Sequence, residues 1–157
     1  MAETRLRVVG YVCRFCALLS ADLGPARESR VRLELLNVPC AGKVDQKLLL
    51  APFEQGADAV FIAGCPEHHC TSIKGSMRAR KRLKSMADLL DEIGVGGRRL
   101  VMFNIAGTEG PRFAQIVNEM EALLDEIGPS PLNQKPDSTG SGDKPKETVQ
   151  KDGEVCA

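Results

Sequence analysis

The stretch AVFIAGCPEHHC, residues 59–70, joins an uninterrupted apolar run to a loop bounded by two cysteines. Six small or apolar residues in succession predict a β-strand that is covered on both faces, as in a parallel sheet. Cys65 and Cys70 bound the loop, and two histidines lie between them. Such thiols serve as metal ligands, as a redox pair or as small buried side chains. Which of these applies depends on where the other cysteines fall.

Three further runs have the length and composition of strands: residues 6–12, 31–38 and 99–107. Helical patterns lie between or after the strands: residues 45–55, 76–93 and 111–127. Alternating strands and helices predict a parallel sheet with right-handed crossovers. The expected fold class is therefore α/β, a small three-layer parallel-sheet domain of flavodoxin-like or Rossmann-like type. We place this domain at residues 5–128 and expect a disordered tail at 129–157, which is rich in Pro, Gly, Ser, Asp and Lys and has no aromatic residue.

Local signals refine these helices. Asp45 is expected to cap the helix over 45–55, and Thr108 the helix over 111–127. Pro52 lies inside the first of these helices, where it removes a backbone donor, so we expect a kink or an early end there. The segment 17–30 has the length of a helix but contains both glycine and proline, so the nature of the first crossover stays open.

Five of the six cysteines follow predicted strands. Cys13 and Cys16 follow the first strand, Cys40 the second, and Cys65 and Cys70 the third. Parallel strands place their carboxyl ends at one edge of the sheet, about 4.8 Å from strand to strand, so these thiols are expected to lie together. Soft thiolates select zinc, cuprous copper or iron–sulfur clusters. Ligands scattered over three strand ends fit a 2Fe–2S cluster, which spreads four thiolates over two irons.

Other interpretations stay open on the residues alone. Each cysteine taken singly could be a small buried hydrophobe, and the set could hold zinc in a protein-interaction module. Cys13 and Cys16 have the C-x₂-C spacing of a dithiol oxidoreductase, although this leaves three thiols unexplained. His68 and His69 could ligate metal as in a Rieske-type site, and His69 could instead bind beside the cofactor and tune it by hydrogen bonding.

Composition and motifs exclude several function classes. The chain has 21 basic and 21 acidic residues, so no net charge draws it to nucleic acid. Neither a dinucleotide-binding nor a P-loop glycine pattern occurs, and no catalytic constellation stands out, which favours electron transfer over bond-making chemistry. No signal-peptide pattern or membrane-spanning run is present, so we expect a cytoplasmic protein. The basic stretch MRARKRLK, residues 77–84, is either a solvated helix face or a docking patch for an acidic partner.

Three segments carry a family resemblance: VVGYVCRFCALLSAD (8–22), NVPCAGKVD (37–45) and FEQGADAVFIAGCPEHHC (53–70). Together with the basic helix that follows, they resemble the delta subunit family of methyl-viologen-reducing hydrogenase over about residues 7–128. The resemblance departs after the first cysteine pair, where this chain has Ala17, Leu18 and Leu19 in place of small residues.

The resemblance implies a small iron–sulfur protein with a 2Fe–2S cluster. Such a subunit relays electrons between an oxidoreductase module and a heterodisulfide-reductase-like, flavin-containing subunit; the module is of hydrogenase, methylenetetrahydrofolate reductase or benzoyl-CoA reductase type. It implies five family cysteines: Cys13, Cys16, Cys40, Cys65 and Cys70. A cluster takes four, and we expect the spare to be Cys13 or Cys16. Cys156 lies outside the resemblance and is expected not to be a ligand.

Overall fold

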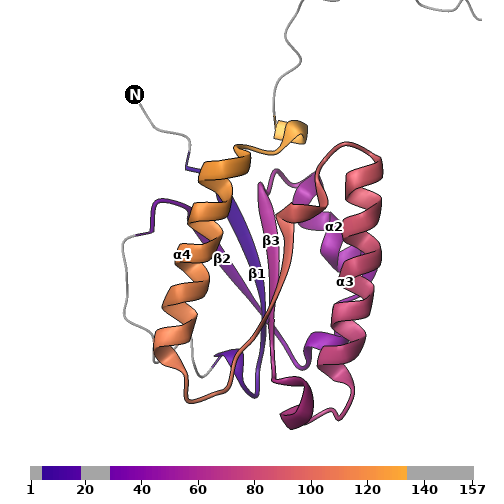
Figure 1. The fold of residues 1–157 in the computed structure, drawn as a ribbon, viewed down its shortest axis with the longest axis vertical. Coiled ribbons are helices and arrows are strands. Elements are labelled where there is room, and N and C mark those ends of the chain that lie inside the picture. The colour runs from indigo at the N-terminus through magenta and orange to yellow at the C-terminus, as the bar shows by residue number, and fades with distance from the viewer. Residues whose placement is uncertain (1–4, 19–28, 134–157) are drawn as a thin grey trace, which may run out of the picture.

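The computed structural model describes residues 5–18 and 29–133, and within them four strands form one parallel sheet (Figure 1). The strands are β1 (Arg7–Cys13), β2 (Arg32–Val38), β3 (Ala59–Gly64) and β4 (Leu100–Asn104). Their order across the sheet is β2-β1-β3-β4, and all three neighbouring pairs are parallel. This is the order of the first four strands of a flavodoxin-like sheet. The predicted α/β class is confirmed.

Helices cover both faces of the sheet. Helices α2 (Gln46–Glu54) and α3 (Gly75–Glu92) lie on one face, and α4 (Gly110–Ile127) lies on the other (Figure 1). The described residues also contain four short 3₁₀ helices: η1 (Ala41–Lys43), η2 (Glu67–His69), η3 (Gly97–Arg99) and η4 (Pro131–Asn133). Every residue of β3 is buried, as its continuous apolar sequence predicts for a central strand.

The two helical layers enclose two separate apolar cores. The core beneath α4 contains Phe61 and Ile116, and the core beneath α2 and α3 contains Ile62 and Leu49. Adjacent residues of β3 serve opposite cores because successive side chains of a strand point to opposite faces. None of the helices in the described ranges is long and apolar enough to cross a membrane.

The helix signals are confirmed in part. Asp45 caps α2, and its carboxylate accepts a hydrogen bond of 2.8 Å from the Leu48 N–H. Pro52 lies within α2, which continues only to Glu54, two residues beyond it. The prediction for Thr108 was wrong: Glu109 occupies the N-cap position of α4, without a side-chain hydrogen bond of its own to the helix. The Glu109 carboxylate instead accepts from the Ala106 N–H at 2.8 Å, so it closes the turn before the helix.

The segment after α4 is packed against the domain as far as the description reaches. Ser130 is fully buried, and its N–H donates to the Asp58 carboxylate at 2.8 Å. Asn133 donates to the same carboxylate at 2.9 Å. Residues 129–133, assigned to the tail from sequence, are therefore folded onto the domain. The rest of the expected tail, and residues 19–28 of the first crossover, lie outside the described residues.

Candidate metal centre

The carboxyl edge of the sheet gathers the cysteines of three adjacent strands. Cys13 is the last residue of β1, Cys65 follows β3 directly, and Cys40 lies two residues beyond β2. Cys16 lies in the turn after β1, and Cys70 follows η2. All five are free thiols. The sequence prediction that these cysteines share one edge is borne out by the parallel order of the strands.

One group of thiols forms around Cys65. The Cys13 and Cys65 sulfurs are 3.6 Å apart, and both side chains are buried beneath α4. Cys16 also hydrogen bonds with Cys65. Burial, followed by the hydrogen bonds with Cys16 and Cys13, raises the pKa of the Cys65 thiol far above its ordinary value. The thiol of Cys65 is thus held protonated in the absence of a cation.

A second pair lies against the first residue of α3. A Cβ on Gly75 would overlap the Cys40 sulfur and stand 3.2 Å from the Cys70 sulfur. Only a residue without a side chain lets both sulfurs approach the helix backbone here. Cys40 also caps η1, where its sulfur accepts from the Gly42 N–H at 3.4 Å. Cys70 additionally packs on the apolar core that contains Cys13 and Cys65, so the two groups are neighbours.

Backbone amides at the start of α3 face the Cys70 thiol. Partial burial by itself raises the pKa of this thiol, but hydrogen bonds from the N–H groups of Ser76, Ser72 and Gly75 outweigh burial and lower the pKa overall. These donors favour the thiolate, which is the form that binds metal. The surroundings therefore lower the pKa of the Cys70 thiol and raise the pKa of the Cys65 thiol.

Two polar side chains that sequence reasoning missed orient the Cys65 peptide. The Ser76 hydroxyl and the Asn104 amide each donate to the Cys65 carbonyl at 2.6 Å. Ser76 is fully buried, and Asn104 ends β4, the one strand of the described sheet that no cysteine follows. Asn104 could have been identified from the sequence, because it is a polar residue at the carboxyl end of an apolar strand. Nothing in the sequence distinguished Ser76 from an ordinary serine at the start of a helix.

The two histidines lie in η2 between Cys65 and Cys70, and both side chains are exposed. The role of His69 beside a cofactor therefore stays a prediction. Across residues 5–18 and 29–133, no group of three or more His, Cys, Asp or Glu side chains is arranged to hold a metal ion. The thiols share an edge and lie in two neighbouring groups. As a donor set, five free thiols suit zinc, cuprous copper or an iron–sulfur cluster.

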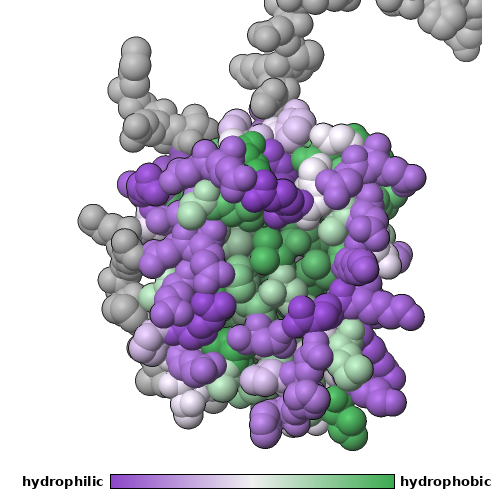
Figure 2. Space-filling view, in the orientation of Figure 1, coloured by the Kyte–Doolittle hydropathy of each residue, from purple (hydrophilic) through white to green (hydrophobic). Residues whose placement is uncertain are grey.

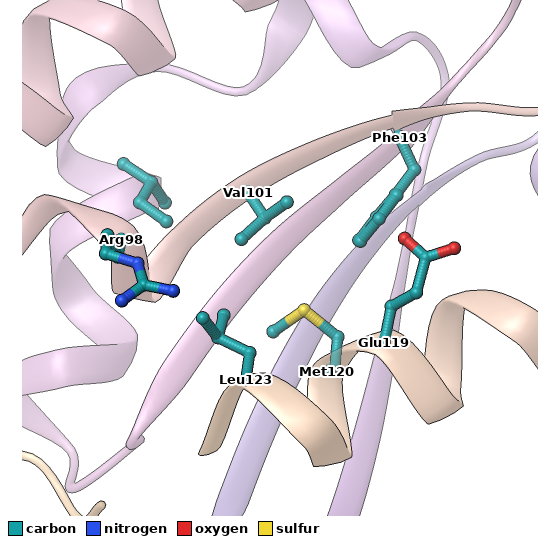
Figure 3. Close-up of a pocket in the computed structure, with 7 residues that line it drawn as sticks. Arg98, Val101, Phe103, Glu119, Met120 and Leu123 are labelled. Carbon is teal, nitrogen blue, oxygen red and sulfur yellow. The ribbon is translucent and has the colours of Figure 1, made fainter. Parts of the chain in front are cut away.

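Two cavities lie away from the cysteines. One of about 340 Å³ lies between β4 and α4, where Val101, Met120 and Leu123 line an apolar trough with Arg98 and Glu119 at its ends (Figure 3). Figure 2 shows apolar surface gathered over β4 between the polar rims of α3 and α4. The other, of about 480 Å³, lies at the amino edge of the sheet. Neither is lined by a cysteine or a histidine.

Fold and thiols together define a class: a flavodoxin-like α/β domain that carries five free cysteines at the carboxyl edge of its sheet. Residues 8–128 match the model of a known family, methyl-viologen-reducing hydrogenase, delta subunit. The chain belongs to this family, which confirms the resemblance drawn from its cysteine segments.

The relatives fall into two kinds. The vhu iron-sulfur subunit of the F420-non-reducing hydrogenase of Methanococcus maripaludis is 36% identical over 80% of this chain and 95% of its own length. Its counterpart in Methanocaldococcus jannaschii is 35% identical over the same shares. A chain of the ferredoxin/F420H2-dependent CoB-CoM heterodisulfide reductase of Methanosarcina acetivorans is 33% identical over 78% of this protein, but the match takes up only 16% of that relative. The same domain thus occurs both as a small chain and as part of a longer one.

Proposed function

We propose that this chain is an electron-transfer subunit that holds a 2Fe–2S cluster at the carboxyl edge of its sheet. It relays electrons between an oxidoreductase module and a heterodisulfide-reductase-like, flavin-containing subunit, and it catalyses no reaction alone. The observation that carries the proposal is the collection of five free thiols at one sheet edge in a family whose members are named iron-sulfur subunits. We place the chain in the cytoplasm.

The proposed ligands come from Cys13, Cys16, Cys40, Cys65 and Cys70. When bound, the cluster supplies a centre that accepts and releases one electron. The chain's own contribution is electrostatic and steric. Amide N–H groups at the start of α3 stabilise a thiolate at Cys70. Ser76 and Asn104 hold the Cys65 peptide, and burial of Cys13 and Cys65 keeps water from that side of the site.

The partners are inferred from the relatives. Because the domain also forms part of a longer heterodisulfide reductase chain in Methanosarcina, we infer that the separate small chain binds a protein of that kind. The hydrogenase subunits among the relatives support an oxidoreductase module on the other side of the relay. A module of methylenetetrahydrofolate reductase or benzoyl-CoA reductase type would use the same relay chemistry.

Anaerobic purification with iron and acid-labile sulfide assays tests the cofactor. About two irons and two sulfides per chain, with a rhombic spin-half EPR signal after dithionite reduction, are expected for a 2Fe–2S centre. Zinc without sulfide would replace the proposal with an interaction module. Metal-free protein with thiol–disulfide activity would replace it with a dithiol oxidoreductase.

A ligand variant tests the site. Cys65→Ser is expected to abolish the visible chromophore, because a serine hydroxyl does not replace the thiolate in a soft-ligand centre. Cys156→Ser is the matched control and should keep the chromophore at the wild-type level. Visible absorption and iron content of both proteins, purified side by side, decide the point. Full colour in Cys65→Ser would show that the ligand assignment is wrong.

A further inference from the structure

Ile73 combines two unfavourable features beside the candidate metal centre. Its φ is +58°, the left-handed region that β-branched residues avoid because Cβ crowds the backbone. Its side chain is also 78% exposed, the highest value among the large apolar residues in the described parts of the chain. The Ile73 N–H donates to the Cys70 carbonyl at 2.8 Å, so its conformation is tied to the loop of a candidate ligand.

Two other exposed apolar side chains lie on the segments that carry the cysteines. Phe15, 55% exposed, lies between Cys13 and Cys16, and Met77, 52% exposed, lies four residues after Ile73 at the start of α3. Cys16 and Cys70 are the two thiols of the five that are only half-buried. The exposed apolar residues therefore flank the thiols nearest to solvent. We call Ile73 and Met77, which lie on the continuous stretch that leads from the Cys70 loop into the first turn of α3, the Ile73 surface.

Positive charges without an ion-pair partner border this surface. Lys74, Arg78 and Lys81 are exposed and recur at helical spacing on the first turns of α3. None of the three takes part in an ion pair with another described residue. Two arginines of the basic stretch serve the fold instead: Arg80 pairs with Glu67 at 2.6 Å, and Arg82 donates to the carbonyls of Gly42 and Val44. The basic stretch is thus divided between structural cations and cations that face solvent.

We propose that the Ile73 surface is the docking site for the heterodisulfide-reductase-like protein, which contacts it through an apolar patch bordered by carboxylates. The identity of the partner rests on the proposed function. Exposed apolar groups rimmed by charge mark protein interfaces, and lasting interfaces are the more apolar ones. A lasting association fits the relatives, since the same domain is part of a longer heterodisulfide reductase chain in two Methanosarcina species. The border cations complement acidic groups on the partner.

The test measures affinity and cluster content separately. Wild type, Ile73→Ser and Ile73→Gly are purified anaerobically, and each is titrated with the purified heterodisulfide-reductase-like, flavin-containing protein of the same organism. Loss of an anchor side chain at the centre of an interface is expected to weaken the Kd by about tenfold or more in both variants. Glycine adopts a positive φ without strain, so Ile73→Gly should also raise the Tm while it weakens binding.

Ile93→Ser is the matched control. Ile93 is 61% exposed and follows the last residue of α3, at the end of that helix away from the cysteines. Its substitution should change the Kd by less than about twofold, as for a surface position outside an interface. The double variant Lys74→Glu/Arg78→Glu should weaken binding and reduce its dependence on salt, because border charges act through screened attraction.

Each outcome bears on either the docking surface or the electron relay. Wild-type affinity in Ile73→Gly, with cluster content unchanged, would show that the Ile73 surface is not the docking site. The electron-relay proposal would still stand. Wild-type protein without iron and sulfide would overturn the relay, whereas the affinity comparison would still report on the surface. Self-association of the chain through Ile73, measured by sedimentation without the partner, would overturn the assignment of the occupant.

Discussion

At residue scale, Gly75 shows how the absence of a side chain positions thiols. The Cys40 sulfur occupies the space that a Cβ would enter, and the Cys70 sulfur would be in tight contact with that Cβ at 3.2 Å. The same helix start provides space for the sulfurs and backbone N–H donors that stabilise a thiolate. The N–H groups of Gly75 and Ser76 donate to Cys70. The environment of this pair is thus set by backbone atoms and not by charged side chains.

We predict that Gly75→Ala lowers the metal content of the proposed centre without removing any of its proposed ligands. The new methyl group must displace the Cys40 sulfur, and overpacking of this kind costs about 1–3 kcal/mol in the free energy of unfolding. Iron and sulfide per chain should fall well below the wild-type values, and urea unfolding gives the stability change.

Gly94→Ala controls for stability in that comparison. Gly94 has a φ of +77° with open space around its Cβ position, so alanine there costs about 1 kcal/mol through backbone strain alone. Because Gly94 lies beyond the far end of α3, its variant should keep the full complement of iron. Equal iron in the Gly75 and Gly94 variants would contradict the proposed role of Gly75.

At element scale, α2 accommodates a proline through a contact with the sheet. Pro52 has no N–H to donate to the carbonyl of Leu48, four residues earlier. The Tyr11 hydroxyl, from β1, donates to that carbonyl at 2.6 Å. Tyr11 itself is buried, and burial, followed by the charges of Asp45 and Glu34, raises the pKa of its phenol. The phenol therefore stays a donor throughout the ordinary pH range.

A double-mutant cycle measures this coupling. Tyr11→Phe should lower the free energy of unfolding by about 1–2 kcal/mol, because the Leu48 carbonyl loses its donor. In a Pro52→Ala background the helix can supply its own N–H, so the same Tyr11→Phe change should cost less. Urea unfolding of the four proteins gives the interaction energy. Equal costs in the two backgrounds would show that the hydroxyl does not substitute for the missing helix bond.

At the scale of the whole molecule, the two edges of the sheet have different tasks. The carboxyl edge carries the thiols, whereas the amino edge carries a buried polar network that closes the domain. Arg99 is 4% exposed and donates to five carbonyls: those of Val95, Asp58, Ile127, Gly128 and Pro129. The Asp58 carboxylate accepts from the N–H groups of Arg7 and Ser130 and from the Asn133 amide. This network joins β1, the start of β3 and the segment after α4.

We predict that substitutions in the polar network of the amino edge lower the free energy of unfolding without changing the proposed metal centre. Asp58→Asn replaces one acceptor oxygen with a donor facing other donors, which should cost about 1–3 kcal/mol in the free energy of unfolding. Asp88→Asn, an exposed site on α3, should be neutral within about 0.5 kcal/mol. Urea unfolding gives the stability change. The EPR signal per folded molecule should match the wild type in both, and a changed spectrum in Asp58→Asn would mean that the edges are coupled.

The amino-acid sequence was sufficient to predict the strands and helices and the edge of the sheet at which the cysteines lie. An uninterrupted apolar run such as β3 predicts a covered strand from local pattern, and alternation with helices predicts parallel strands. Once the strands are parallel, cysteines that follow them must share one edge, so the positions of Cys13, Cys40 and Cys65 followed without coordinates. Helix caps were less certain, because Glu109 and Thr108 both lie where a cap is possible and only the turn geometry chooses between them.

The contacts between these groups, in contrast, came from the packing of the folded chain. The contact of Cys13 with Cys65, the approach of Cys40 to Gly75, and the Tyr11 bond to Leu48 join residues far apart in the chain. Such distances depend on register and helix placement, which a one-dimensional pattern does not encode. The conformation of Ile73 was not predictable either, because the sequence around it does not distinguish it from a buried apolar residue. Its left-handed backbone lies in the loop that leads from Cys70 into α3, where amides of Ser72, Gly75 and Ser76 are directed at the Cys70 thiol, and a one-dimensional pattern does not encode such a loop.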